Sequence, residues 1–545
     1  MNIRSALLVL LGGLLAPGTA LEACTNLLVT KGASKDGSTM ITYAADSHTL
    51  YGELDFKRGT PHLPAEMREI IEWDTGKLLG RIPEAPVTYT RVGNMNEFQV
   101  VIGETTYGGR KELQVPSGFV DYGSLIYIGL ERARTAREAI QVMTSLAETY
   151  GYASEGESFS IGDPNEAWIL EMIAKGKGQT GALWVAYKLP DGTISAHANQ
   201  ARIRQFPRND PNTALFSKDL ISFAREKGYF KGEDKDFSFA DTYAPLSYGA
   251  LRFCESRVWS LFRRAAPSQN LSIDYVKAVK GAKPLPLFIK PDQKLDVRDV
   301  MQLVRDHFEG TEFDMAKDLG AGPYKLPYRW RPMNFKVDGQ EYLHERAIST
   351  QQTGFSFVSQ SRSWLPDVVG GVLWFGVDDT FLTVYVPISC GAREAPKAFA
   401  VGTGNFNEFN WDSAFWTFNF VSNYTYTRWI DMIVDVQKVQ REFEGRFLAD
   451  QAEIDRTALD LYKQNPAMAK DYLTQYAAKN TGQLMTRWKK LGEFLIWKYL
   501  DGNVRNEKGE VTHPNAPEEW LRCIVKDHGD VIKMKKVEGL APDEE

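Results

Sequence analysis

The chain has 545 residues, of which 43% are hydrophobic and 25% are charged, so it is long enough for a large core and has the composition of a globular protein. Its formal net charge is -6, and no run is rich in lysine and arginine. This charge pattern argues against nucleic acid as a partner.

The first 23 residues have the pattern of a signal peptide. Arg4 supplies the positive charge, an apolar stretch runs from Ala6 to Leu15, and a Pro-Gly pair ends it. This stretch is too short to span a bilayer as a helix. Cleavage fits after Ala20, which leaves a short propeptide of residues 21–23, or after Ala23. We therefore expect an exported protein, periplasmic or secreted, without a membrane span.

Either route of cleavage can leave Cys24 as the first residue of the mature protein. A thiol is a strong nucleophile once deprotonated, and a free α-amino group titrates near pH 8, so one residue can supply nucleophile and base. Two other interpretations remain open from these residues alone. Leu21 to Cys24 resembles a lipobox, in which the cysteine would be acylated, and Cys24 can also be a structural cysteine.

A predicted hairpin brings a carboxylate back to Cys24. Residues 25–30 and 38–45 have strand composition, and the segment between them is rich in turn residues. If the strands pair, Cys24 lies opposite about Ala44, and Asp46 falls at the open end beside the mature N-terminus. A carboxylate there can hold and orient the α-ammonium group.

Several long motifs lie between Ala23 and about residue 440. They are ACTNLLVTKGASKDGSTMITYAADSH (23–48), NMNEFQVVIGETTYGG (94–109), ESFSIGDPNEAWILE (157–171), DGTISAHANQARI (191–203) and a block within 354–387. Together they resemble the bacterial cysteine dipeptidases of the N-terminal-nucleophile (Ntn) hydrolase superfamily. These are related to secernins, and more distantly to choloylglycine hydrolases and penicillin V acylases.

The resemblance implies an α+β fold, the Ntn-hydrolase αββα sandwich of two antiparallel sheets covered by helices, and chemistry without a metal or organic cofactor. The residues themselves agree with a sheet-rich chain. Strand-like runs are predicted at residues 98–102, 159–162, 167–172, 182–187 and 193–198, and one amphipathic helix is predicted between Thr135, as its N-cap, and Gly151, as its C-cap.

The resemblance also implies roles for four residues. Cys24 matches the nucleophile, and Asp46 matches the carboxylate near its amine. Asn199, in HANQAR, matches an asparagine that helps to bind the oxyanion in the acylase relatives. Arg257, in CESRVW, matches an arginine near the nucleophile, with Arg252 as the alternative.

The sequence departs from the family pattern near the nucleophile. Many relatives have Arg-Asn shortly before the aspartate, where this chain has Tyr43 and Ala44. Thr105 stands where acylase relatives use an oxyanion-binding asparagine, and its backbone N–H is a candidate substitute. His197 is expected to be structural, as are Cys254 and Cys390 as buried small hydrophobic residues.

The C-terminal part has a helical pattern. We expect a catalytic domain over residues 24–422, a helical extension over 423–500 that packs on it, and a polar tail over 501–545. The extension shows one apolar stripe from Trp429 to Phe443, a break at Asn465-Pro466, and further apolar residues at helical spacing up to Tyr499.

The sequence therefore predicts an exported cysteine peptidase that hydrolyses short peptides, most simply dipeptides, through an acyl-enzyme on Cys24. One alternative is a hydrolase of non-peptide N-acyl amides, such as bile-salt conjugates or penicillin V. Another is a non-catalytic exported lipoprotein or binding module. Assays that compare dipeptides with acyl amides as substrates distinguish the first two hypotheses. The mass of the mature N-terminus distinguishes both from a lipoprotein.

Overall fold

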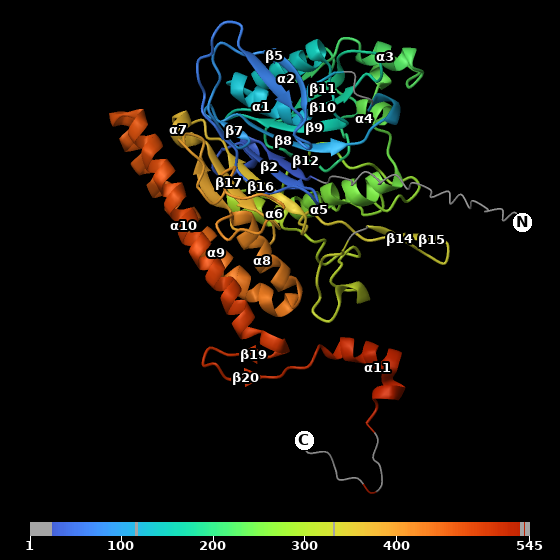
Figure 1. Cartoon of the computed structure of the whole chain (residues 1–545). Helices are drawn as coiled ribbons and strands as arrows, with labels where there is room; N and C mark the ends of the chain where they lie inside the picture. The colour runs from blue at the N-terminus through green and yellow to red at the C-terminus, as the bar shows by residue number, and fades with distance from the viewer. Residues whose placement is uncertain (1–23, 115–117, 331–332, 535–538, 540–545) are drawn as a thin grey trace, which may run out of the picture.

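Two large antiparallel sheets form the centre of the protein, shown in Figure 1 as a computed structural model. The structure describes residues 24–114, 118–330, 333–534 and 539, so the predicted signal peptide and propeptide lie outside the described residues. The first sheet has the strand order β12-β1-β2-β16-β17-β18. The second has the order β13-β11-β10-β9-β8-β7-β6-β3.

The strands of the first sheet are β1 (Asn26–Val29), β2 (Met40–Asp46), β12 (Ile194–His197), β16 (Thr353–Gln360), β17 (Val372–Val377) and β18 (Val386–Ser389). Those of the second are β3 (Phe56–Lys57), β6 (Arg91–Val92), β7 (Met95–Asn96), β8 (Val101–Tyr107), β9 (Gly156–Gly162), β10 (Ala167–Ala174), β11 (Ala182–Lys188) and β13 (Ala214–Phe216). Three hairpins lie outside the sheets: β4 (Met67–Ile71) with β5 (Leu78–Pro83), β14 (Asn334–Val337) with β15 (Gln340–Leu343), and β19 (Val504–Arg505) with β20 (Val511–Thr512).

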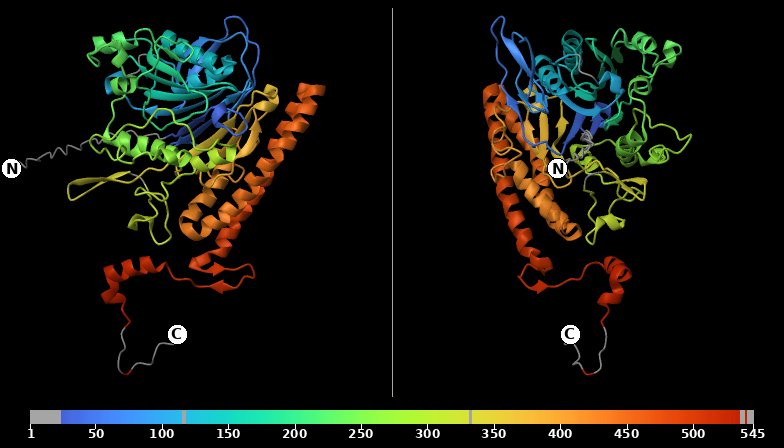
Figure 2. Two further views of the ribbon diagram at one scale, coloured as in Figure 1. Left: turned by 180° about the vertical axis from the view of Figure 1, so that it is seen from behind. Right: turned by 45° about the vertical axis from the view of Figure 1, so that its right-hand side comes forward.

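The helices are α1 (Tyr122–Arg132), α2 (Ala136–Tyr150), α3 (Leu220–Glu226), α4 (Phe239–Tyr243), α5 (Ser256–Ala265), α6 (Val297–Val304), α7 (Asp367–Gly370), α8 (Ala414–Tyr426), α9 (Trp429–Gln464), α10 (Pro466–Lys498) and α11 (Glu518–Ile532). Helices α1 and α2 pack on the second sheet, whereas α5, α6, α8, α9 and α10 contact strands of the first (Figure 2).

Strand β10 shows how the layers form two cores. Its side chains alternate, so Ile169 and Ile173 join the core between the sheets, and Trp168 and Leu170 join the core beneath α1 and α2. Every residue of β10 is buried, since both faces of the strand are covered. The α+β prediction with antiparallel sheets is confirmed.

The hairpin of β1 and β2 forms, but its register differs by one residue from the prediction. Thr25 pairs with Ala44, and Val29 pairs with Met40, so the same register places Cys24 opposite Ala45. A 3-10 turn at Lys31–Ala33 lies in the connection between the two strands. Asp46 remains the last residue of β2.

The C-terminal region is helical, as predicted. Asn465 caps α10 by accepting a hydrogen bond from the N–H of Ala467, and Pro466 occupies the first turn, so α9 ends and α10 begins there. The apolar residues after this break lie on one continuous helix, whose Trp488 stacks on Phe418 of α8 with ring centroids 4.4 Å apart. Helix α8 already begins at Ala414, so position 423 lies inside it.

The predicted polar tail contains the β19–β20 hairpin and α11. No residue of α11 is buried, and the helix lies apart from the two sheets (Figures 1 and 2). The boundaries proposed for the catalytic domain, the extension and the tail remain predictions.

The N-terminus of α2 offers a test of local stability. The hydroxyl of Thr135 accepts a hydrogen bond from the N–H of Glu138 at 3.1 Å. We expect Thr135→Ala to lower the free energy of unfolding by about 1 kcal/mol, because one N–H of the first turn loses its partner. Urea unfolding measures this change. Thr135→Ser keeps the hydroxyl and should keep most of the stability; equal losses in both variants would contradict the capping role.

Candidate active site

Cys24 lies two residues before the start of β1 and is 4% exposed. It lines a cavity of about 150 Å³, which we call the Cys24 cavity. The cavity is lined by Cys24, Tyr43, Ala45, Asp46, Ser47, Thr49, Leu50, Trp73, Asp74, Glu104 and Tyr122. A candidate nucleophile and three carboxyl groups therefore share one small space.

Arg257 holds the backbone of Cys24 from behind the cavity. It lies in the first turn of α5 and is fully buried. Its Nη1 donates to the carbonyl oxygen of Cys24 and to Oγ1 of Thr25, both at 2.7 Å. Its Nη2 donates to Oδ1 of Asn199 at 2.8 Å. Arg257 thus links the candidate nucleophile to the predicted oxyanion residue.

Asn199 follows β12 and adopts a left-handed backbone conformation, with φ 61°. Its Nδ2 donates to the carbonyl oxygen of Thr106 at 2.6 Å, while its Oδ1 accepts from Arg257. The described residues that line the Cys24 cavity do not include Asn199. The structure therefore brings Asn199 close to Cys24 through Arg257, and a direct contact with substrate remains a prediction.

Asp46 is held at the end of β2 by residues far away in the sequence. Its Oδ1 accepts a hydrogen bond from Oγ1 of Thr353 at 2.7 Å. Its Oδ2 lies 3.8 Å from Nη2 of Arg346, whose side chain is buried. Arg346 brings a positive charge to this carboxylate. Many relatives have an arginine at the position of Tyr43, and this chain has none there.

Glu104 of β8 places a carboxyl group next to the thiol, and the sequence did not single it out. Its Oε1 lies 3.6 Å from Sγ of Cys24 and accepts a short hydrogen bond from the hydroxyl of Tyr43. The Tyr43 hydroxyl itself lies 3.9 Å from Sγ. Tyr43 and Glu104 therefore surround the thiol where the relatives' arginine was expected.

Burial shifts the titration of this cluster. Glu104 is 2% exposed, and loss of water raises its pKa above the ordinary value, although hydrogen bonds from Tyr43 and Glu157 oppose the shift. Burial also raises the pKa of Tyr43 well above 10.0. Both shifts favour the neutral forms. The thiol is the donor in its contacts with both groups, because Tyr43 gives its own hydroxyl proton to Glu104.

Two other sequence alternatives are resolved by contacts. His197 is buried between Oγ1 of Thr105 and Oγ of Ser160, each 2.7 Å from a ring nitrogen. Burial lowers the pKa of His197 to about 3, which fits a structural residue. Arg252 pairs with Glu345, so Arg257 is the arginine next to Cys24.

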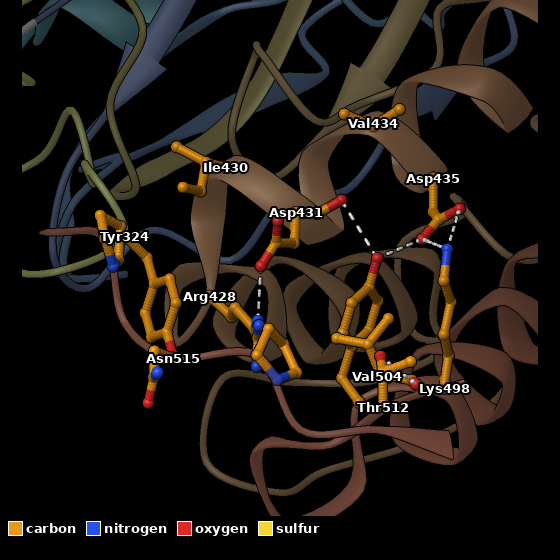
Figure 3. A pocket seen from close by; sticks show the side chains of 13 residues that line it. Tyr324, Arg428, Ile430, Asp431, Val434, Asp435, Lys498, Val504, Thr512 and Asn515 are labelled. Carbon is orange, nitrogen blue, oxygen red and sulfur yellow. Dashed lines mark hydrogen bonds and ion pairs between the residues drawn. The ribbon is translucent and has the colours of Figure 1, made fainter. Parts of the chain in front are cut away.

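A larger cavity of about 520 Å³ lies at the C-terminal helices (Figure 3). Its charged side chains pair with one another: Arg428 with Asp431, and Lys498 with Asp435. None of the predicted site residues lines it.

In the part of the chain that the structure describes, no helix is long and apolar enough to cross a membrane.

Comparison with known proteins gives a match over the part of the chain that contains Cys24. A family model described as peptidase family C69 matches residues 23–442. The chain is similar to a probable dipeptidase from Latilactobacillus sakei, with 26% identity over 398 residues that cover 70% of this chain and 76% of the relative. It is also similar to a probable dipeptidase from Salmonella dublin, with 26% identity covering 68% and 82% of the two chains. A dipeptidase from Bifidobacterium longum is 26% identical over 56% of this chain and 63% of its own length.

Proposed function

The chain belongs to peptidase family C69, and on that premise we propose that it is an exported cysteine dipeptidase with Cys24 as an N-terminal nucleophile. One observation carries the proposal. Within the matched region, Cys24 lines a cavity with Asp46, and Arg257 binds its backbone carbonyl. The relatives' names support dipeptides as substrates.

The proposed fold is the Ntn-hydrolase αββα sandwich. Its support is the face-to-face packing of two antiparallel sheets, with helices on the outer side of each. In this arrangement Cys24 precedes β1, the first strand of the chain, and lines the cavity. Removal of residues 1–23 would therefore leave its α-amino group at the cavity beside Asp46.

The proposed reaction uses the α-amino group as base. The Cys24 thiol passes its proton to the amine, and Sγ forms a bond to the scissile carbonyl carbon. The oxyanion is stabilised by nearby N–H donors, with Asn199 as the predicted side chain. When the carbon–nitrogen bond breaks, the ammonium returns the proton to the leaving amine. Water then hydrolyses the thioester and frees the acid.

Asp46 and Arg257 position the reacting residue in this scheme. Asp46 is 1% exposed, and its carboxylate would hold the α-ammonium of Cys24. Arg257 fixes the carbonyl of the same residue, so both ends of the Cys24 backbone are held while Sγ reacts.

The mass of the secreted protein tests the processing. The proposal expects a mature chain that begins at Cys24, without lipid, and that hydrolyses dipeptides. A chain that begins at residue 21 or earlier and is fully active would contradict the N-terminal nucleophile. A mass excess from a lipid on Cys24 would replace the proposal with the lipoprotein alternative, because acylation blocks the thiol and the amine.

Glu104 gives the pH dependence of the proposed reaction. A neutral Glu104 places no negative charge beside the thiolate, whereas its carboxylate would repel the thiolate. Because burial raises the pKa of Glu104, the neutral form persists above the range of an exposed glutamate, and activity should fall as the pH rises through that raised pKa. Glu104→Gln cannot ionise, so we expect its kcat/KM to persist to higher pH.

The pH profile of kcat/KM for wild type and Glu104→Gln measures this effect. The groups that face Glu104 are Cys24, Tyr43, Glu157 and, at longer range, Asp74, and they are identical in the two proteins. Glu104→Ala serves as control, because it leaves the buried Tyr43 hydroxyl without its acceptor, and its kcat/KM should be lower by about tenfold at every pH. Loss of activity in Glu104→Gln across the whole range would show that the carboxylate form is required.

A further inference from the structure

A second cavity, of about 360 Å³, adjoins the Cys24 cavity. Ser47 and Leu50 line both cavities. Thr353, in the wall of the second cavity, donates the hydrogen bond to Asp46, and the N–H of Ser47 donates to the carbonyl oxygen of Gln352 at 3.1 Å. The two cavities therefore share part of one wall.

The second cavity, which we call the aromatic cavity, has four aromatic side chains in its wall: Trp330, Phe406, Phe415 and Trp416. The ring centroids of Phe415 and Trp416 are 5.2 Å apart, and those of Phe406 and Trp416 are 6.2 Å apart. Phe406 is 38% exposed and Trp330 is 63% exposed, so the cavity presents aromatic surface to solvent. Covering such surface with an apolar group is favourable.

The polar part of this wall has no carboxylate. The described residues that line the aromatic cavity include no aspartate, glutamate, lysine or arginine, and their polar side chains are those of Ser47, His48, Gln351, Gln352, Thr353 and Asn419. The amide of Asn419 donates to Asp378, at 2.9 Å, behind the wall. A cationic side chain would enter without an opposite charge, which is costly, so the cavity disfavours a cationic occupant.

The volumes of the two cavities also support a substrate that occupies both. The Cys24 cavity alone, at about 150 Å³, is smaller than the roughly 300–1,000 Å³ of typical ligand sites. The aromatic cavity adds the room that a second residue of a peptide needs.

We propose that the aromatic cavity is the subsite for a bulky apolar side chain of the peptide, on the residue next to the scissile bond. This inference rests on the proposed dipeptidase function. It goes further by naming the substrate class, which is dipeptides with one aromatic or large aliphatic residue.

The test measures kcat/KM of the mature protein for Ala-Ala, Ala-Phe, Phe-Ala and Ala-Lys. Wild type should prefer Ala-Phe or Phe-Ala over Ala-Ala by about tenfold or more, and the preferred order tells which residue occupies the aromatic cavity. Ala-Lys should be no better than Ala-Ala. A preference for Ala-Lys would overturn the inference in favour of cation binding by the rings.

Phe406 is the residue to change, because its side chain is partly exposed and lies in the loop before α8. Phe406→Ala should reduce the preference for the favoured Phe peptide over Ala-Ala by about tenfold. Phe406→Glu should reduce it further and raise Ala-Lys relative to Ala-Ala, because the new carboxylate supplies an opposite charge. These ratios are taken within one variant, so they do not depend on how much of it is folded.

Trp364→Ala is the matched control, because Trp364 is 51% exposed and does not line either cavity. It should keep the wild-type ratios. If Phe406→Ala and Phe406→Glu also keep the wild-type ratios, the subsite assignment is wrong although the dipeptidase proposal stands. If wild type hydrolyses none of the four peptides, the dipeptidase proposal itself fails.

Discussion

Cys24→Ala is expected to lower the kcat of dipeptide hydrolysis by more than about 10⁴-fold, because the variant has no group to form the acyl-enzyme. The surrounding cavity is unchanged by loss of one sulfur atom, so substrate binding should survive. Steady-state kinetics with Ala-Phe and Phe-Ala measure the loss, and isothermal titration with the same peptides measures the retained binding.

The other cysteines provide matched controls for Cys24. Cys390 is buried, its Sγ donates to the carbonyl oxygen of Asp367, and neither residue lines the Cys24 cavity. Cys523 is exposed on α11. Cys390→Ala and Cys523→Ala should keep kcat within a fewfold of wild type. Retention of wild-type activity by Cys24→Ala would rule out the proposed mechanism, whatever the state of the N-terminus.

Arg257→Lys is expected to lower kcat/KM by about 10²-fold and the free energy of unfolding by about 3 kcal/mol. The guanidinium of Arg257 donates at once to the Cys24 carbonyl and to Asn199, from two different nitrogens. A lysine ammonium is a single point and cannot reach both acceptors, so at least one buried acceptor loses its partner. Urea unfolding and steady-state kinetics measure the two effects.

Arg252→Lys is the control for this substitution. Arg252 lies one turn earlier in the same helical segment, where it pairs with Glu345. A lysine can keep that single ion pair, so activity should change little. An activity loss in Arg252→Lys as large as that in Arg257→Lys would mean that any change in this segment disturbs the site, and would remove the specific role of Arg257.

The sequence predicted the residues of the candidate site better than it predicted their contacts. The hairpin argument placed Asp46 near Cys24 because two strands and one turn are adjacent in the chain. The register was off by one residue, since the 3-10 turn after β1 has no clear signature in the sequence. Arg257 and Asn199 came from the resemblance alone, and the structure shows that they contact each other.

Glu104 was missed for a physical reason. It belongs to β8 in the second sheet, and Tyr43 belongs to β2 in the first, so their contact depends on how the two sheets pack. No local pattern encodes that packing. One signal was available: an acidic residue in the middle of the strand Val101–Tyr107, which is otherwise neutral, is unusual in a buried position.

Helix α9 has a practical consequence for anyone who wishes to shorten the protein. The family match ends at residue 442, in the middle of this helix. Glu444, just beyond that point, accepts hydrogen bonds from the buried Arg305 and from the N–H of Tyr385. A version trimmed to the family boundary would leave Arg305 without its carboxylate and would uncover Phe418, which Trp488 of α10 stacks upon. The smallest piece that we expect to express in soluble form therefore ends after α10, near residue 500, rather than where the sequence similarity stops.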